Sequence, residues 1–251
     1  MDVELLLMGT TGVLFIIFLL WELYLPARVY TKASKVNSYF TNAGVFIFNN
    51  VVTYGLSISL VFVAVSSLSI HGLFGVLPLW AQYVVGIVLL DFFIWFWHMI
   101  NHKVPLLWSF HQTHHSERYL NASSAVRFHV GELLLSVLFK SLILIITGIP
   151  LVVFLTYEAL ITIFAIYHHA NIKLSPKIQS ILEFVIISPR LHQTHHSEVR
   201  EEHDSNYGVI FSWWDIIFKT KNKTNPERIG LSYEEEKNLR GFLAMPFIRK
   251  G

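Results

Sequence analysis

The chain has 251 residues, of which 53% are hydrophobic and only 14% are charged, and its mean hydropathy is +0.51. Because average soluble domains have about a quarter of their residues charged, this composition indicates a membrane protein. The formal net charge of +2 is too small to argue for nucleic-acid binding, and the lack of cysteine excludes disulfides, thiolate metal ligands and thiol catalysis.

The first apolar run, Leu5–Leu25, is long enough to cross a bilayer, which takes about 20 helical residues. It lacks the layout of a cleaved signal peptide, so we expect a retained membrane anchor. Arg28, Lys32 and Lys35 follow it. Since cytoplasmic loops are enriched in basic residues, this segment is expected on the cytoplasmic side.

A second apolar run, Gly44–Ile70, is expected to return across the membrane as one span. The turn at residues 71–78 has no charged residue, as expected of a short outside loop. A third run begins near Leu79, and at 1.5 Å per residue it reaches about 30 Å further on at His98. This histidine is therefore expected at the cytoplasmic boundary.

Two further apolar segments, Leu133–Ile149 and Leu151–Ile166, are separated by a break at Gly148 and Pro150. The pattern predicts an all-α fold, an integral membrane helical bundle with a cytoplasmic histidine-rich cap. The expected regions are N-terminal transmembrane helices at 1–78, a catalytic region at 79–220 and a polar C-terminal tail at 221–251.

A repeated hexapeptide is the most informative feature of the sequence. His-Gln-Thr-His-His-Ser occurs at residues 111–116 and again, letter for letter, at 192–197. Of the 13 histidines, 12 fall between His98 and His203. A polar loop whose histidines face water could explain one such box, but it does not explain two identical ones.

On a helix, histidines three or four residues apart project from one face, with Cβ atoms roughly 5–6 Å apart. A third pair with this spacing ends the third apolar run. Imidazole suits iron, copper, zinc and nickel, and eight ligands are too many for one ion, so the spacing predicts two ions about 3.5–4 Å apart. The eight are His98, His102, His111, His114, His115, His192, His195 and His196.

Other histidines could complete the set, namely His129 and either His168 or His169. His203 is expected to be an exposed loop residue, and His71 to lie on the opposite side of the membrane. No acidic residue stands within the three histidine groups, and neither a Glu-x-x-His nor a His-Glu-x-x-His motif occurs. We therefore expect a nitrogen-only centre for two metals at the membrane face.

The three histidine groups resemble the H-x3-H, H-x2-HH and H-x2-HH boxes of the fatty acid hydroxylase and sterol desaturase superfamily. The similarity covers roughly residues 79–220, and residues flanking the boxes also match. These are Asp91, Pro105, Trp108, Arg127-Phe128-His129, His169-Ala170-Asn171, Asn206-Tyr207-Gly208 and Trp214-Asp215.

This resemblance implies a membrane enzyme with a non-haem di-iron centre that uses O2 to hydroxylate or desaturate a lipid of the sterol or fatty-acyl type. It implies that the eight histidines above are iron ligands, with His169 and less securely His129 as further ones. We expect the reductant to come from a separate haem or iron-sulfur carrier or from a reduced pterin.

Two other functions fit a histidine cluster. A membrane zinc hydrolase would need a general base, for which Glu132, Glu198 and Glu201 are candidates. A divalent-metal transporter should have its ligands near the bilayer midplane, whereas these cluster at one end of the predicted spans.

Overall fold

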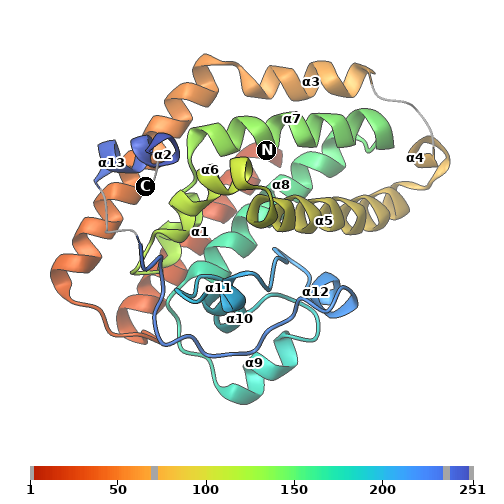
Figure 1. Ribbon diagram of the computed structural model, residues 1–251. Helices are drawn as coiled ribbons and strands as arrows, with labels where there is room; N and C mark the ends of the chain where they lie inside the picture. The colour runs from red at the N-terminus through yellow and green to blue at the C-terminus, as the bar shows by residue number, and fades with distance from the viewer. Residues whose placement is uncertain (1–2, 69–72, 234–237, 249–251) are drawn as a thin grey trace.

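The computed structural model of this protein describes residues 3–68, 73–233 and 238–248 (Figure 1). Within these ranges the chain forms α-helices and two short 3-10 helices, and backbone pairing between extended segments is limited to three isolated bridges. The all-α prediction is confirmed. The helices are α1 Val3–Tyr24, α2 Lys32–Gly55, α3 Ile58–Leu68, α4 Leu73–Val76, α5 Leu79–Lys103, α6 Pro105–His115, η1 Ala122–Val126, α7 Val130–Thr147, α8 Leu151–His169, α9 Pro176–Leu182, α10 Pro189–His195, α11 Arg200–His203, α12 Trp213–Ile217, α13 Leu239–Ala244 and η2 Met245–Phe247.

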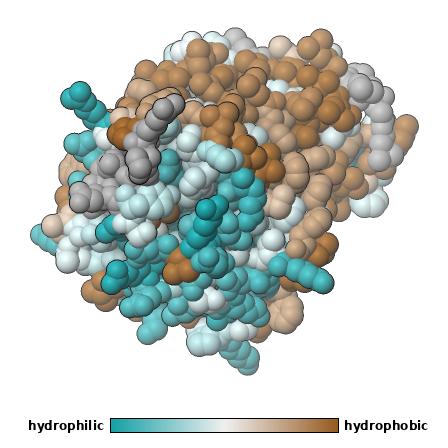
Figure 2. Space-filling model, viewed as in Figure 1, coloured by the Kyte–Doolittle hydropathy of each residue, from teal (hydrophilic) through white to brown (hydrophobic). Residues whose placement is uncertain are grey.

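Three of these helices, α5, α7 and α8, are long and apolar enough to cross a membrane, and α1 contributes a shorter apolar stretch, Gly9–Tyr24. In Figure 1, α3, α5 and α7 run alongside one another, whereas α9, α10 and α11 lie together below them. Figure 2 shows hydrophobic residues over the first group and hydrophilic residues over the second. The molecule thus has an apolar body that suits lipid and a polar cap.

Close packing joins α5 to α8 in the apolar body. A Cβ on Gly86 would lie 2.6 Å from Val153 Cγ1, so only glycine permits this approach of the two helices. Phe154 and Tyr157 of α8 are fully buried beside it. Helices in lipid associate through such close contacts, since lipid tails are as apolar as their side chains.

The break between α7 and α8 lies where the sequence predicts it. Gly148 ends α7 in the left-handed conformation, with φ of 67°, and Pro150 caps the start of α8. Glycine adopts this conformation without steric cost and proline cannot continue a helix, so the two residues set the turn. Across the two helices Lys140 Nζ donates to Glu158 Oε2 at 2.8 Å.

The apolar run over about Gly44–Ile70 does not form one continuous helix, and its last two residues lie outside the described residues. The helix α2 ends at Gly55, Ser57 has a positive φ of 50°, and α3 starts anew at Ile58. The cause lies in the polar face of α2, where the buried Asn42 contacts Glu117 and Asn49 Nδ2 donates to a backbone carbonyl of the cap. This face binds α2 to the polar cap, so its axis diverges from that of α3 (Figure 1).

The region beyond residue 221 packs against the cap rather than standing apart from it. Residues 222–231, which we call the strap, run along the second His-Gln-Thr-His-His-Ser box, where Gly230 N donates to His196 O at 3.0 Å and Ser197 pairs with Ile229. Further on, Phe242 and Met245 are buried. The strap therefore forms one wall of the histidine-rich region.

Candidate metal centre

Four helices deliver the histidines to one place. His98 and His102 end α5, the first box forms the last turns of α6, His169 ends α8, and the second box forms α10 and its C-cap. Proline at the first position starts both short helices, and the Ser188 side chain accepts a hydrogen bond from Leu191 N at the start of α10. Each box is therefore a helix end that faces the same interior space.

The ring nitrogens form two compact groups, in each of which the possible ligand atoms all lie within 4.8 Å of one another. All but one of these histidines are buried, and the exception is half-buried. The first group contains His98, His102, His111, His115 and His195, and the second contains His114, His169, His192 and His196. All eight histidines of the three sequence groups, together with His169, thus come together.

Hydrogen bonds fix the protonation of one facing pair. His98 Nδ1 lies 2.8 Å from the carbonyl oxygen of Tyr207, and His111 Nδ1 lies 2.8 Å from Glu132 Oε1. Since a carbonyl and a carboxylate only accept, both Nδ1 atoms carry the hydrogen, and in the neutral tautomer each Nε2 atom carries a lone pair. These two Nε2 atoms lie 3.2 Å apart, and lone pairs at this distance repel unless a cation lies between them.

The second group repeats this arrangement. His114 Nδ1 and His169 Nδ1 donate to the carbonyls of Arg127 and Ala165, at 3.2 and 2.7 Å, and their Nε2 atoms face each other at 3.1 Å. Two nitrogens bound at about 2.1 Å to one ion lie about 3 Å apart when they subtend a right angle. The spacing is that of ligands around a shared ion.

Several further ring nitrogens in the two groups are buried and have no hydrogen-bond partner among the described residues. They include Nε2 of His102, both nitrogens of His115, Nε2 of His195 and Nδ1 of His192. Buried polar atoms without partners are rare in proteins. The chemistry of the donor set, imidazole alone, fits a transition-metal ion in each group.

Burial also keeps the box histidines neutral. It lowers the pKa of His114, His115, His192, His195 and His196 well below 6.5, and the neighbouring imidazoles lower it further. A neutral imidazole is the form that binds a metal.

Carboxylates stand behind the histidines rather than among them. Glu132, buried in the first turn of α7, accepts from His111. Such a partner orients the ring and raises its basicity. Asp204 Oδ1 lies 3.3 Å from His102 Nδ1, but no hydrogen bond joins the two atoms. From the sequence, Glu132 is expected only as a possible general base. Its position three residues after His129, at the start of a helix, is the signal that could have linked it to the histidine boxes.

Among the described residues, three histidines lie outside the two groups. His129 caps α7, with Nδ1 accepting from Gly131 N and Nε2 donating to the Leu243 carbonyl, so neither nitrogen is free for a metal. His168 is buried, and its ring centroid lies 3.9 Å from that of His192, with the two ring planes tilted by 42°. We leave both out of the ligand set.

The expectation that His203 is exposed is wrong. His203 is buried, stacks on Trp108 at 5.4 Å and donates through Nδ1 to the carbonyl of Ser197. It thus supports the end of the second box. His71, expected on the opposite side of the membrane, lies outside the described residues.

Two buried aspartates hold the loop that supports His98. Asp215 accepts from Tyr207 N, Gly208 N and Trp95 Nε1, and Asp91 accepts from Trp214 Nε1 and from two backbone amides of the same loop. The carbonyl of Tyr207 is the acceptor for His98, so these carboxylates fix a ligand through the backbone. Their number of hydrogen bonds explains why acids are tolerated in an apolar region.

Comparison with known proteins agrees with this geometry. The fatty acid hydroxylase family matches residues 83–220. The chain is 33% identical over 179 residues to an ornithine lipid hydroxylase of Rhizobium tropici, which covers 69% of this chain and 53% of the relative. It is 29% identical over 157 residues to human alkylglycerol monooxygenase, covering 61% of this chain and 33% of the relative.

The chain thus spans about half the length of the first relative and a third of the second. No solved structure matches it. The family match covers more than half of the chain and includes all three histidine boxes and the loop that supports them. This protein is a membrane protein that belongs to the fatty acid hydroxylase family.

Proposed function

We propose that this protein is a membrane-bound oxidoreductase that holds two iron ions and uses O2 to hydroxylate a lipid. The observation that carries the proposal is the pair of neighbouring imidazole groups, each containing two facing Nε2 lone pairs about 3 Å apart. Two ions account for both groups, whereas one ion accounts for only one of the two facing pairs.

Iron is supported by the family and by the ligand type, since imidazole suits iron and the family is named for hydroxylation. When bound, the iron pair would supply the redox chemistry by which O2, two electrons and two protons convert a C–H bond into C–OH and release one water. The relatives are named for an ornithine lipid and for alkylglycerol, and both names describe addition of oxygen. Hydroxylation is therefore favoured over desaturation, with a membrane lipid as the substrate.

The role of the chain is to hold the ions and to keep water away. We propose His98, His102, His111, His115 and His195 as ligands of one ion and His114, His169, His192 and His196 as ligands of the other. Backbone carbonyls and Glu132 hold the Nδ1 hydrogens, so the Nε2 lone pairs point inward without rearrangement. Electrons would come from a separate carrier, a haem or iron-sulfur protein or a reduced pterin.

We propose that the chain crosses the membrane several times and that the histidine-rich cap faces the cytoplasm, with the catalytic region at 79–220. The linker after α1 is basic, which favours the cytoplasmic side of the membrane. It lies against the cap, because Arg28 Nε donates to Gln193 Oε1 of the second box. An apolar substrate could then reach the site from the bilayer, and electrons could arrive from the cytoplasm.

The zinc-hydrolase alternative is not favoured, because each of its candidate bases is either engaged by another side chain or exposed. Glu132 is held by His111, Glu198 pairs with Arg228 at 3.9 Å, and Glu201 is exposed. Metal transport is not favoured either, since the groups lie at one end of α5 and α8 rather than at the midpoint of the spans.

Lipid extracts from cells with and without this protein, grown under 18O2, test the proposal. We expect a hydroxylated lipid that carries the label only in the presence of the protein. A His195→Ala variant, matched in expression, should lack the product. Label-free hydroxylation, or a product that persists in that variant, would contradict an O2-dependent reaction at this centre.

A further inference from the structure

The loop that follows the second box reaches far along α5, away from the metal groups. Asp91 is the middle residue of α5, and its carboxylate accepts from Ile210 N and Phe211 N at 3.3 and 3.2 Å. At about 1.5 Å per residue, Asp91 lies roughly 10 Å from His98 toward the other end of the helix, and about 18 Å from that end. The loop therefore lies beside the apolar part of α5 rather than beyond its end.

Aromatic rings hold α12 at the same level of α5. The Phe92 ring lies 5.2 Å from that of Trp214 and 6.1 Å from that of Phe218. The Trp95 ring lies 4.5 Å from that of Phe218, and Trp214 Nε1 donates to Asp91 Oδ2 at 2.8 Å. These contacts pack α12 against a helix that is long and apolar enough to cross a membrane.

The outward side of α12 is apolar, and it continues onto the segment after α9, because Ser212 N donates to Val185 O at 3.0 Å. We call this region the α12 surface, and its exposed apolar side chains are Phe184, Val185, Trp213, Ile216, Ile217 and Phe218. Phe184 is 72% exposed and Ile217 is 61% exposed. Large apolar side chains grouped in this way mark a surface that contacts something other than water.

The exposed charges beside the α12 surface are all positive. In the two segments that carry it, residues 173–185 and 211–223, the acidic residues are Glu183 and Asp215, which are 1% and 0% exposed. The lysines of these segments are partly or fully exposed, and they are Lys173, Lys177, Lys219, Lys221 and Lys223. Lysines next to an exposed apolar face are typical of a surface that lies at the headgroups of anionic lipids.

The backbone of the loop at 207–211 is suited to a region without water. Asp215 accepts hydrogen bonds from two of its amides, and Asp91 accepts from two more. At membrane depth, non-helical backbone is tolerated where the protein itself satisfies the polar groups. The two buried carboxylates meet this requirement for four amides of the loop.

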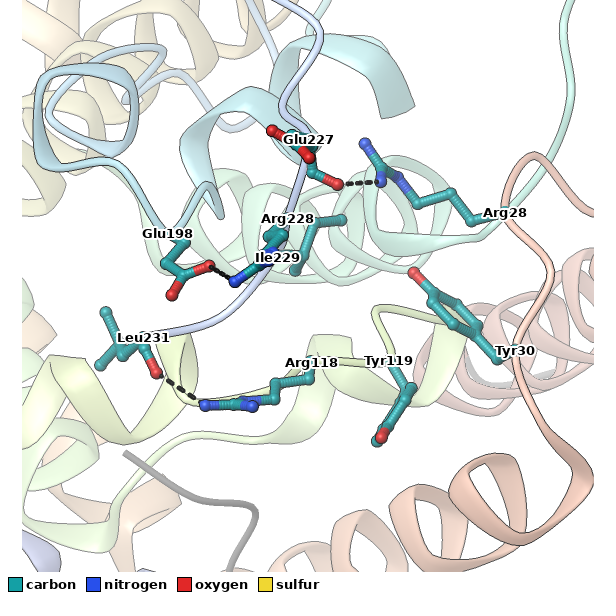
Figure 3. Close-up of a pocket in the computed structure, with 9 residues that line it drawn as sticks. All are labelled: Arg28, Tyr30, Arg118, Tyr119, Glu198, Glu227, Arg228, Ile229 and Leu231. Carbon is teal, nitrogen blue, oxygen red and sulfur yellow. Dashed lines mark hydrogen bonds and ion pairs between the residues drawn. The ribbon is translucent and has the colours of Figure 1, made fainter. Parts of the chain in front are cut away.

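The strap side of the cap has a different chemistry. The cavity between the strap and the two boxes is lined by side chains of both charge signs, among them Arg228 and Glu198, which lie 3.9 Å apart (Figure 3). Three quarters of the Arg228 side chain is exposed. This side suits water, so the apolar character of the α12 surface is not a general property of the cap.

We propose that the α12 surface is inserted into the lipid leaflet next to the metal centre, with its apolar side chains among the acyl chains and the flanking lysines at the headgroups. Amphipathic elements of this kind lie about 5–10 Å deep at the boundary between headgroups and acyl chains. A lipid leaflet fits better than a soluble partner, because α12 packs beside the apolar part of α5. Insertion requires that α5 crosses the membrane, which is part of the proposed function, but it is independent of the chemistry of the metal centre.

A fluorophore placed at one position at a time tests this insertion, since the chain has no cysteine of its own. Ile217→Cys and Phe184→Cys are each labelled with an environment-sensitive dye, and the full chain is reconstituted into phosphatidylcholine vesicles. The quenchers are a nitroxide on the lipid acyl chain and iodide on both sides of the vesicles. We expect both labels to be quenched by the nitroxide, to be protected from iodide, and to emit at shorter wavelength than a label in water.

Two matched variants provide the references. Val84→Cys, at a 56% exposed apolar position of α5, reports the lipid environment, and Arg228→Cys reports the aqueous one. Iodide quenching at Ile217 and Phe184 as strong as at Arg228, with the Val84 label protected, would overturn the insertion alone. Protection from both quenchers would mean that protein covers the surface, which also overturns it. Iodide quenching at Val84 would refute the crossing by α5 and the insertion together.

Discussion

Glu132 is the residue that ties the apolar body to the metal ligands, because it reaches from the first turn of α7 to His111 Nδ1. Replacing it with glutamine keeps the shape and removes the charge. Loss of such a partner lowers metal affinity by about 10- to 100-fold. We therefore expect Glu132→Gln to bind iron more weakly, as measured by competition with a chelator.

The matched control is Glu201→Gln, which removes an exposed carboxylate of α11. It should leave the iron affinity unchanged. Equal affinities in the two variants would show that the carboxylate beside His111 does not tune its basicity.

Alanine variants of His129 and His114 distinguish a structural histidine from a proposed metal ligand. His129→Ala removes the helix cap that accepts from Gly131 N, so it should lower stability by about 1 kcal/mol and leave the metal content unchanged. His114→Ala should lose metal, because one of the facing Nε2 atoms disappears. Elemental analysis and thermal unfolding of both variants measure this, and metal loss from His129→Ala would contradict it.

Spacing identified the eight box histidines because it follows directly from helix geometry. It could not decide whether His129, which lies outside the three boxes, joins them, nor did it find the burial of His203, because both depend on contacts with distant residues. His129 meets the carbonyl of Leu243, and His203 stacks on Trp108. No local pattern encodes such partners.

Among the structural elements, the strap depends on one glycine for its backbone conformation. Gly230 has φ of +105°, and a Cβ there would lie 2.7 Å from Arg118 Cγ. Gly230→Ala should therefore lower the free energy of unfolding by about 1–3 kcal/mol, through backbone strain and this contact.

Thermal unfolding in detergent measures this change. Gly55→Ala is the control, because a Cβ at Gly55 meets nothing within 4 Å. If both variants unfold at the same temperature, the conformation of the strap does not depend on Gly230.

The ends of the helices were predictable where the local residues set them and unpredictable where distant polar contacts set them. The breaks at Gly148 and Pro150 came directly from the sequence. The break at Ser57 did not, because hydropathy cannot show that Asn42 and Asn49 contact the cap rather than the headgroup region.

At the scale of the whole molecule, burial of the box histidines makes stability depend on pH. Burial lowers the pKa of His114, His192 and His195 below 6.5 in the folded metal-free protein, so they stay neutral there. The unfolded chain takes up protons below that pH, and stability is therefore lost as the pH falls from about 6.5 toward the folded pKa values. The melting temperature of the metal-free protein should drop in this range and be nearly constant above it.

Acid should also release the metal, since protons compete for the same nitrogens. A melting temperature that stays constant from pH 7.5 to pH 5.5 would contradict neutral, buried imidazoles.

We propose above that imidazoles from four helices hold two ions in one cap. The most direct measurement is the metal content of the purified protein, by elemental analysis with Mössbauer spectroscopy of an 57Fe-labelled sample. The account predicts about two irons per chain, coupled as neighbours. A single zinc per chain, or isolated iron whose amount is unchanged by His114→Ala and His195→Ala, would contradict it.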